Sequence, residues 1–313
     1  MESVDVICIG NASVDVPLRY VNEDIFTTDS YSLESIKLMV GGSAMNVSTI
    51  LTNLGKTVKL IAMLGNDLLG DFVIKHCLNI GIDVSHIIRN KEVDTPLNIG
   101  LVRPDGERTF IVGRNSSTFH FSSSDIDTEG IKNAKLLHFA SIFIMPHFEE
   151  KGLSNIFSKA KDNGIIVCAD MMKSRQGERL NAIVNSLVHV DYFFSNYDEA
   201  SFLTGLSKKE EIAYKLMECG IKNVIIKCGE KGCYIKNGEF ETECPTFVNK
   251  NVADTIGAGD NFAAGFITGI LDGLSFIDCA RFANATASIS VGSAGAVSGV
   301  KNKQQVINLI LDN

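Results

Sequence analysis

Residues 58–81 read VKLIAMLGNDLLGDFVIKHCLNIG and carry the pattern that decides the fold. The first part, VKLIAML (58–64), is a short apolar run, which is typical of a buried β-strand. The second part, GDFVIKHCLNIG (70–81), has apolar residues at helical spacing and ends on a glycine, as helix C-termini commonly do. A strand followed at once by a helix is half of a βαβ unit.

The same order of strand and helix recurs along the whole chain. Further strands are predicted at VDVICI (4–9), KLLHFA (135–140), IIVCAD (165–170), DYFFS (191–195) and VIIKC (224–228). Further helices are predicted at AMNVSTILTNLG (44–55), EKGLSNIFSKAKDNG (150–164) and KEEIAYKLMECG (209–220). Such alternation implies a mostly parallel sheet with helices on both faces. Because no linker interrupts it, we predict a single α/β domain over residues 1–313.

Two stretches break this rhythm. Residues 12–40 contain extended pieces, and residues 95–113 (TPLNIGLVRPDGERTFIVG) read as two strands around a Pro-Asp-Gly turn signal. Both suggest antiparallel ribbon inserted into the parallel core, which would form a lid over a site at the strand ends. The alternative interpretation is surface decoration.

The composition limits the classes of function. The chain is 45% hydrophobic and 21% charged with a formal net charge of −8, which is ordinary for a globular protein and argues against a nucleic-acid partner. The eight cysteines are scattered and form no C-x-x-C pair, which favours reduced thiols. No secretion signal and no membrane-spanning run is visible, so we expect a cytoplasmic location without a membrane partner.

The sharpest chemical signal is DTIGAGD (254–260), followed by the helix-like NFAAGFITGIL. Two glycines at the mouth of a helix let backbone N–H groups approach a phosphate, and the helix dipole adds positive charge there. Asp260 would lie in the first turn, where a carboxylate repels phosphate unless it has a task. Accepting the proton of an attacking hydroxyl is such a task. The alternative is an aspartate placed there to suit the dipole.

DTIGAGD resembles the C-terminal signature of the ribokinase-like, PfkB-type carbohydrate kinases, D-T-x-G-A-G-D. The family's G-G-x-x-x-N pattern is similar to GGSAMNV (41–47), and its N-x-x-E pattern is met by NYDE (196–199). The order and spacing also match over nearly the whole chain. The resemblance implies a ribokinase-like fold, ATP and Mg²⁺ as cofactors, and transfer of a phosphoryl group to a hydroxyl of a small sugar.

The resemblance assigns roles around the helix mouth. Asp260 aligns with the catalytic base, and Gly257, Ala258 and Gly259 with the anion hole. Thr255 would line the phosphate channel. Some members bind a monovalent cation through backbone carbonyls of this loop and of a later one, which GSAGA (292–296) resembles, so K⁺ beside Asp254 is also expected.

The resemblance also implies a sugar site and a nucleotide site. Predicted substrate residues are Asn11, Asp15, Gly41, Gly42 and Asn46, with Arg114 reaching in from the lid. The alternatives are a turn residue for Asp15, a helix cap for Asn46 and a solvated side chain for Arg114. Predicted nucleotide residues are Asn196, Lys227, Gly229, Gly232 and Asn284, and Glu199 is expected to hold Mg²⁺ through water. The alternatives here are a capping pair for 196 and 199, a hairpin turn for 227–232 and a core amide for Asn284.

The sequence does not choose the acceptor. DMMK (170–173) departs from the D-x-N-x-R-like pattern of many relatives, because Met172 replaces the Asn and the Arg is missing; Lys173 could substitute electrostatically. A nucleoside or vitamin-precursor kinase remains an alternative, with Phe110, Phe119 and Phe121 available for stacking, as does a non-catalytic sugar sensor. A Rossmann oxidoreductase would need G-x-G-x-x-G, where this chain has GNASVD (10–15). Exposed ribbon edges favour a homodimer.

Overall fold

The computed structural model describes residues 3–104 and 107–313. Its centre is an eight-stranded sheet in the order β14-β13-β12-β11-β10-β9-β1-β4. The strands are β1 (Val4–Ile9), β4 (Val58–Ile61), β9 (Ala134–Ile142), β10 (Ile166–Met171), β11 (Tyr192–Asn196), β12 (Asn223–Lys227), β13 (Cys233–Lys236) and β14 (Glu241–Cys244). From β4 to β12 all neighbours run parallel, and only β13 and β14 are antiparallel.

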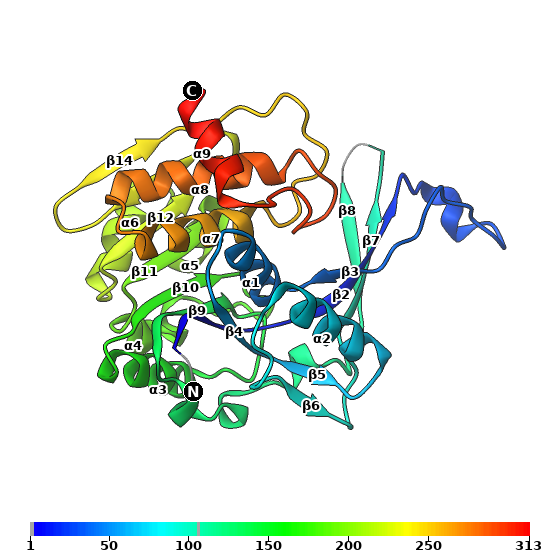
Figure 1. The fold of residues 1–313 in the computed structure, drawn as a ribbon, viewed down its shortest axis with the longest axis horizontal. Coiled ribbons are helices and arrows are strands. Elements are labelled where there is room, and N and C mark those ends of the chain that lie inside the picture. The colour runs from blue at the N-terminus through cyan, green and yellow to red at the C-terminus, as the bar shows by residue number, and fades with distance from the viewer. Residues whose placement is uncertain (1–2, 105–106) are drawn as a thin grey trace.

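Helices cover both faces of this sheet, and each face has its own apolar core (Figure 1). One face is packed by α1 (Ser43–Asn53), α2 (Leu68–Ile80), α7 (Ala258–Leu271), α8 (Phe276–Ser290) and α9 (Lys303–Leu311). The other is packed by α3 (Glu150–Asp162), α4 (Val184–Leu187), α5 (Tyr197–Thr204) and α6 (Lys209–Glu218). The central strands are nearly fully buried, which explains their unbroken apolar runs.

A second sheet of four strands, which we call the small sheet, stands beside the core in the order β3-β2-β7-β8 (Figure 1). It consists of β2 (Ser13–Arg19), β3 (Met39–Gly41), β7 (Leu97–Val102) and β8 (Arg108–Val112). The two inserted segments predicted from the sequence thus meet in one sheet. It is mixed rather than purely antiparallel, because β2 and β7 run parallel. Residues 105–106 of the expected turn lie outside the described residues.

The predicted α/β architecture, a mostly parallel sheet with helices on both faces, is confirmed. One predicted strand was wrong in extent: the run 58–64 divides at Ala62 into β4 and β5 (Met63–Gly65). β5 leaves the central sheet and pairs with β6 (Ile88–Asn90) instead. Strands β13 and β14 and helix α9 were not predicted. Within the described ranges, no helix is long and apolar enough to cross a membrane.

Candidate active site

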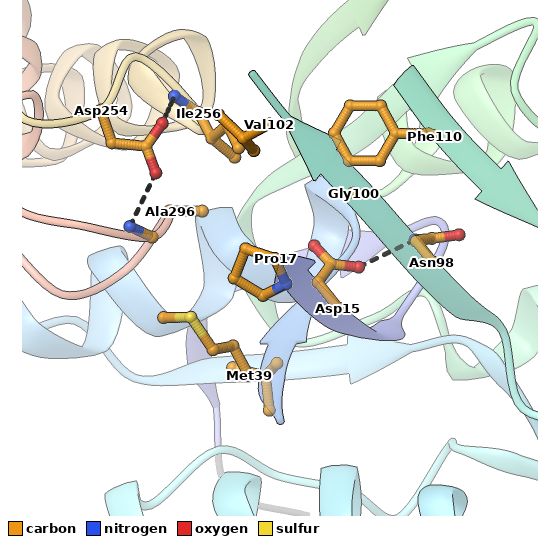
Figure 2. A pocket seen from close by; sticks show the side chains of 12 residues that line it. Asp15, Pro17, Met39, Asn98, Gly100, Val102, Phe110, Asp254, Ile256 and Ala296 are labelled. Carbon is orange, nitrogen blue, oxygen red and sulfur yellow. Dashed lines mark hydrogen bonds between the residues drawn. The ribbon is translucent and has the colours of Figure 1, made fainter. Parts of the chain in front are cut away.

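A cavity of about 290 Å³ opens where the carboxyl ends of the parallel strands meet the small sheet. Its polar lining includes Asn11, Asp15, Ser43, Asn46, Asn98, Arg108, Ser116, Thr118 and Arg175, and its apolar lining includes Phe110, Phe119, Ile144, Met172 and Ile256. A smaller adjoining cavity, shown in Figure 2, shares Asp15, Asn98, Phe110 and Ile256 with it. The cavity is therefore built jointly by the two sheets.

The DTIGAGD segment forms a tight turn into α7 beside this cavity. Gly257, the N-cap, lies on the cavity wall in the left-handed region with φ +76°, and a Cβ there would meet the Cβ of Ala296 at 2.4 Å. A Cβ on Gly259 would lie 3.2 Å from the Nζ of Lys227. The N–H groups at the mouth of α7 and one lysine ammonium thus converge, which is the composition of an anion site.

Asp260 lies in the first turn of α7 and accepts a hydrogen bond from Nδ2 of Asn46, on α1, at 2.7 Å. Burial raises the pKa of its carboxyl from 3.8 to about 7, and the nearby charge of Asp170 adds to the increase. The hydrogen bond from Asn46 and the charge of Lys227 act in the opposite direction. A carboxyl with a pKa near neutrality is suited to accept a proton at physiological pH.

The charges around Asp260 come from the ends of neighbouring strands. Asp170, near the end of β10, is buried, accepts a hydrogen bond from the N–H of Ser141, and has its pKa raised chiefly by burial. His138 lies 3.9 Å from it, but burial lowers the pKa of this imidazole to about 3, so it stays neutral. Lys227, at the end of β12, is therefore the cation that offsets these carboxylates.

Asp15, on β2, lines both cavities from the small sheet, and Figure 2 shows it in the smaller one. Its Oδ1 accepts hydrogen bonds from Nδ2 of Asn98 at 2.8 Å and from the hydroxyl of Ser13 at 3.0 Å, and burial raises its pKa. A Cβ on Gly41 would lie 2.0 Å from Oδ2 of Asp15, so only glycine permits this approach. The pair predicted from the sequence is therefore brought together.

Asn11 and Gly42 shape the beginning of α1. Oδ1 of Asn11 accepts a hydrogen bond from the N–H of Ser43 at 3.1 Å, and Gly42 has φ +88° with a Cβ position 2.7 Å from the carbonyl of Asn11. Asn46 follows one turn later, and its buried Oδ1 has no hydrogen-bond partner among the described residues. Such an unpaired acceptor at a cavity wall suits a ligand hydroxyl.

Asn196 and Glu199 form the capping box that was the alternative interpretation of the N-x-x-E string. Oδ1 of Asn196 accepts from the N–H of Glu199 at 2.8 Å, and Oε2 of Glu199 accepts from the N–H of Asn196 at 2.7 Å. Burial raises the pKa of Glu199, and the charge of Lys227 opposes the increase. No hydrogen bond within residues 3–104 and 107–313 uses Oε1 of Glu199, which leaves that oxygen for a hydrated metal ion.

Two predicted nucleotide residues are occupied with packing. Gly232 needs glycine because a Cβ would lie 2.0 Å from the carbonyl of Cys244, on β14. Nδ2 of Asn284, buried on α8, donates to the carbonyls of Cys244 at 3.0 Å and Pro245 at 3.2 Å. Gly232 thus allows the 244–245 segment to pack closely, and Asn284 holds it by hydrogen bonds. Gly229, with φ +59°, has open space where its Cβ would be, and is free to approach a ligand.

The arginines at the cavity are not the one singled out from the sequence. Arg114 is exposed and is not part of the lining, whereas Arg108 and Arg175 are. Arg108, on β8, donates to the hydroxyl of Thr255 at 3.4 Å. Lys173 lies over the ring of Phe202 instead of the cavity. Arg175 was missed because it stands one place beyond the position that the D-x-N-x-R spacing would give it.

Asp254 does not present a free carboxylate. It pairs with Arg19, at the end of β2, and accepts hydrogen bonds from the N–H groups of Ile256 and Gly295, both at 3.0 Å (Figure 2). In the part of the chain that the structure describes, no group of three or more His, Cys, Asp or Glu side chains is placed to hold a metal.

Solved structures similar to this one show that its fold is the ribokinase-like α/β fold. The structure of Arabidopsis thaliana ribokinase complexed with ribose and ATP has a TM-score of 0.83 at 22% identity, covering 98% of this chain and 99% of that one. A putative ribokinase II from E. coli in complex with ATP and Mg²⁺ has a TM-score of 0.86 at 20% identity, covering 99% of this chain and 100% of that one.

Sequence comparison then identifies the family. The chain belongs to the pfkB family of carbohydrate kinases, whose model matches residues 4–303, and is therefore a phosphotransferase with an alcohol group as acceptor. It is 28% identical to the 2-dehydro-3-deoxygluconokinase of Bacillus subtilis, over 87% of this chain and 86% of that protein. It is 26% identical to the ATP-dependent 6-phosphofructokinase of Thermoanaerobacterium thermosaccharolyticum, over 94% of this chain and 89% of that protein.

Proposed function

We propose that this protein transfers the γ-phosphoryl group of ATP to a hydroxyl of a small sugar or sugar derivative, with Asp260 as the general base. The observation that carries the proposal is the carboxyl of Asp260, held by Asn46 at the mouth of α7, with a pKa raised to about 7. A base with that pKa beside an anion-binding turn is what hydroxyl activation for phosphoryl transfer requires.

In the proposed reaction the proton of the acceptor hydroxyl passes to the carboxylate of Asp260 as the oxygen attacks the γ-phosphorus. The bond to the bridging oxygen breaks, and ADP leaves with that electron pair. The N–H groups following Gly257 and the ammonium of Lys227 stabilise the charge on the transferring group. Mg²⁺, held near Glu199 and Asn196 through water, would neutralise phosphate charge.

The sugar is proposed to lie in the 290 Å³ cavity. Oδ2 of Asp15 offers an acceptor from the small sheet, and Oδ1 of Asn46 offers an unpaired acceptor from α1. Each can accept a hydrogen bond from a hydroxyl of a polyol. Gly42 and Gly257 leave the backbone accessible on the same wall.

The test is ADP release from ATP over a panel of pentoses, hexoses, sugar acids and nucleosides. Asp260→Asn is expected to lower kcat by about 10²- to 10⁴-fold, the usual reach of general-base catalysis, with nucleotide binding retained. Asp278→Asn is the matched control, because Asp278 also lies in a first helical turn, of α8, where it pairs with Ser275 away from the cavity. A near-normal rate for the Asp260 variant would contradict the mechanism.

We further propose that the acceptor carries an anionic group. Arg108 and Arg175 line the cavity and form no ion pair with the residues described in the structure. An arginine is a strong partner for a carboxylate or a phosphate. Arg175→Gln should therefore raise KM for an acidic sugar much more than for its neutral counterpart, and an equal effect on both would count against this substrate class.

A nucleoside acceptor is the second candidate, favoured by Phe110 and Phe119, which both line the cavity. Phe121, which was also considered from the sequence, is buried and packs against Phe148. A vitamin precursor with an alcohol group is a related candidate, and ADP release in its presence would test it in the same way. Turnover with nucleosides and not with sugars would favour this candidate, and binding of a sugar without any ADP release would favour a non-catalytic sensor.

A further inference from the structure

The carboxylate of Asp254, beside which a monovalent cation was expected, is already surrounded by hydrogen-bond donors. Its Oδ2 accepts from the guanidinium of Arg19 and from the N–H of Gly295 at 3.0 Å, and its Oδ1 accepts from the N–H of Ile256 at 3.0 Å. The side chain of Asp254 is 7% exposed and that of Arg19 is 26% exposed. Each oxygen therefore accepts at least one hydrogen bond, and the negative charge is paired with the guanidinium.

Three of the nearby carbonyl groups also accept hydrogen bonds. The carbonyl of Ala296 accepts from Nδ2 of Asn261 at 2.7 Å, and the carbonyl of Gly257 accepts from the same side chain at 2.8 Å. The carbonyl of Val291 accepts from the N–H groups of Ala253 and Asp254. Monovalent cations are held by several carbonyl oxygens that converge on one point. Here these three carbonyls accept from amide groups, and the carboxylate of Asp254 accepts from a guanidinium. We therefore infer that this set of residues does not fit a K⁺ site.

We propose that the guanidinium of Arg19 takes the place of the monovalent cation, so that the activity of this protein does not depend on K⁺. The inference rests on the phosphoryl transfer proposed above for its kinetic part. A guanidinium and a potassium ion would repel each other at this carboxylate, since both carry a full positive charge. Arg19 therefore supplies the positive charge that a potassium ion would supply, and it also keeps that ion away from Asp254.

The position of Arg19 gives the replacement a further consequence. Arg19 ends β2 in the small sheet, and Arg108, on β8 of the same sheet, reaches Thr255. Two arginines from the small sheet thus hold residues 254 and 255, immediately before the turn at Gly257. We infer that Arg19 is a positioning residue, because it acts on the anion-binding turn through Asp254 and does not itself line the cavity.

The experiment compares KCl with N-methyl-D-glucamine chloride at equal ionic strength. Two quantities are measured for each protein: the midpoint of thermal unfolding without substrates, and the rate of ADP release with the best acceptor. Arg19→Gln is the test variant. Arg89→Gln is the matched control, because Arg89 also pairs with an aspartate, Asp71 at 2.8 Å, but outside this loop.

For the unmodified protein we expect the same unfolding midpoint in both salts and a rate that changes by less than about twofold, which is within nonspecific salt effects. Arg19→Gln leaves Asp254 without its cation, so we expect a lower midpoint and a several-fold lower rate, both partly restored by KCl. Arg89→Gln should lose stability without any specific response to K⁺.

Specific stabilisation or activation of the unmodified protein by K⁺ would overturn the inference, whether or not the Arg19 variant folds. A folded Arg19→Gln protein that ignores K⁺ in both measurements would overturn the statement that the guanidinium stands where a cation would. The unfolding midpoints need no acceptor. Failure of the whole acceptor panel would therefore refute the proposed function and leave the cation experiment decisive.

Discussion

Lowering the pH from 8 to 6 should remove most of the catalytic activity, because the proposed base then takes up a proton. The folded protein raises the pKa of Asp260 from 3.8 to about 7. At pH 8 roughly 90% of the carboxyl groups are ionised and at pH 6 only about 10%, so kcat/KM should fall about tenfold, with a slope of one per pH unit below the pKa. An aspartate with an ordinary pKa would stay ionised throughout this range.

Two substitutions should shift the acid limb of the pH profile, the range in which kcat/KM falls as the pH is lowered, in opposite directions. The charge of Asp170 raises the pKa of Asp260, and the charge of Lys227 lowers it. Asp170→Asn should therefore shift the limb to lower pH, and Lys227→Met should shift it to higher pH. Asparagine keeps an oxygen that can accept the hydrogen bond from the N–H of Ser141, so the first variant retains the local contact.

The assay is ADP release measured across pH 5 to 9 with the coupling enzymes in excess, and the same titration of Asp278→Asn serves as the control. A rate that stays level down to pH 5 would refute the raised pKa. Shifts of the same sign in the Asp170 and Lys227 variants would refute the electrostatic explanation, because the two charges are opposite.

Three further outcomes are expected. Asp260→Asn should stabilise the protein above pH 4, because ionised Asp260 destabilises the fold increasingly as the pH rises from 3.8 to about 7. The destabilisation is at most about 4 kcal/mol, and it is smaller than that because the side chain is partly exposed. Denaturant unfolding should therefore show that the free energy of unfolding of the variant exceeds that of the unmodified protein by more at pH 8 than at pH 5. Gly257→Ala should lower both stability and kcat, since the added Cβ would meet Ala296 at 2.4 Å in a left-handed conformation. The free energy of unfolding should fall by about 1 to 3 kcal/mol. An unchanged free energy of unfolding would show that the turn can relax. We propose that the edge strand β8 of the small sheet, where Ile111 is 52% exposed, pairs with a second copy of the chain to form a homodimer. Ile111→Glu should then give monomers, which light scattering after gel filtration would detect. A monomeric unmodified protein would refute the proposal.

The sequence predicted those parts of the fold that depend on patterns among neighbouring residues. The apolar runs located the parallel strands to within one or two residues, and the glycines located the ends of helices such as α2, which stops at Gly81. The parallel pairing of β2 with β7 was not predictable in this way, since it joins segments more than 80 residues apart. The division at Ala62 was missed because an apolar run gives no sign of where a strand changes sheets.

The candidate site shows the same division. DTIGAGD located the turn and the carboxyl at Asp260, because those residues are contiguous and their conformational needs are local. The pairing of Arg19 with Asp254 joins residues 235 positions apart, and the sequence around neither residue indicates it. The contribution of Asp170 to the pKa of Asp260 likewise depends on two strand ends meeting in space, which only the folded chain supplies.

The shared ladder between β2 and β7 has a consequence for how acceptor preference could diverge among relatives of this chain. The two halves of the small sheet arise from separate connections, one between β1 and α1 and the other between β6 and β9, yet six residue pairs join them. Transplanting either half alone from another kinase would break that ladder. Exchange of both segments as one module should preserve it, while the parallel core beneath stays untouched.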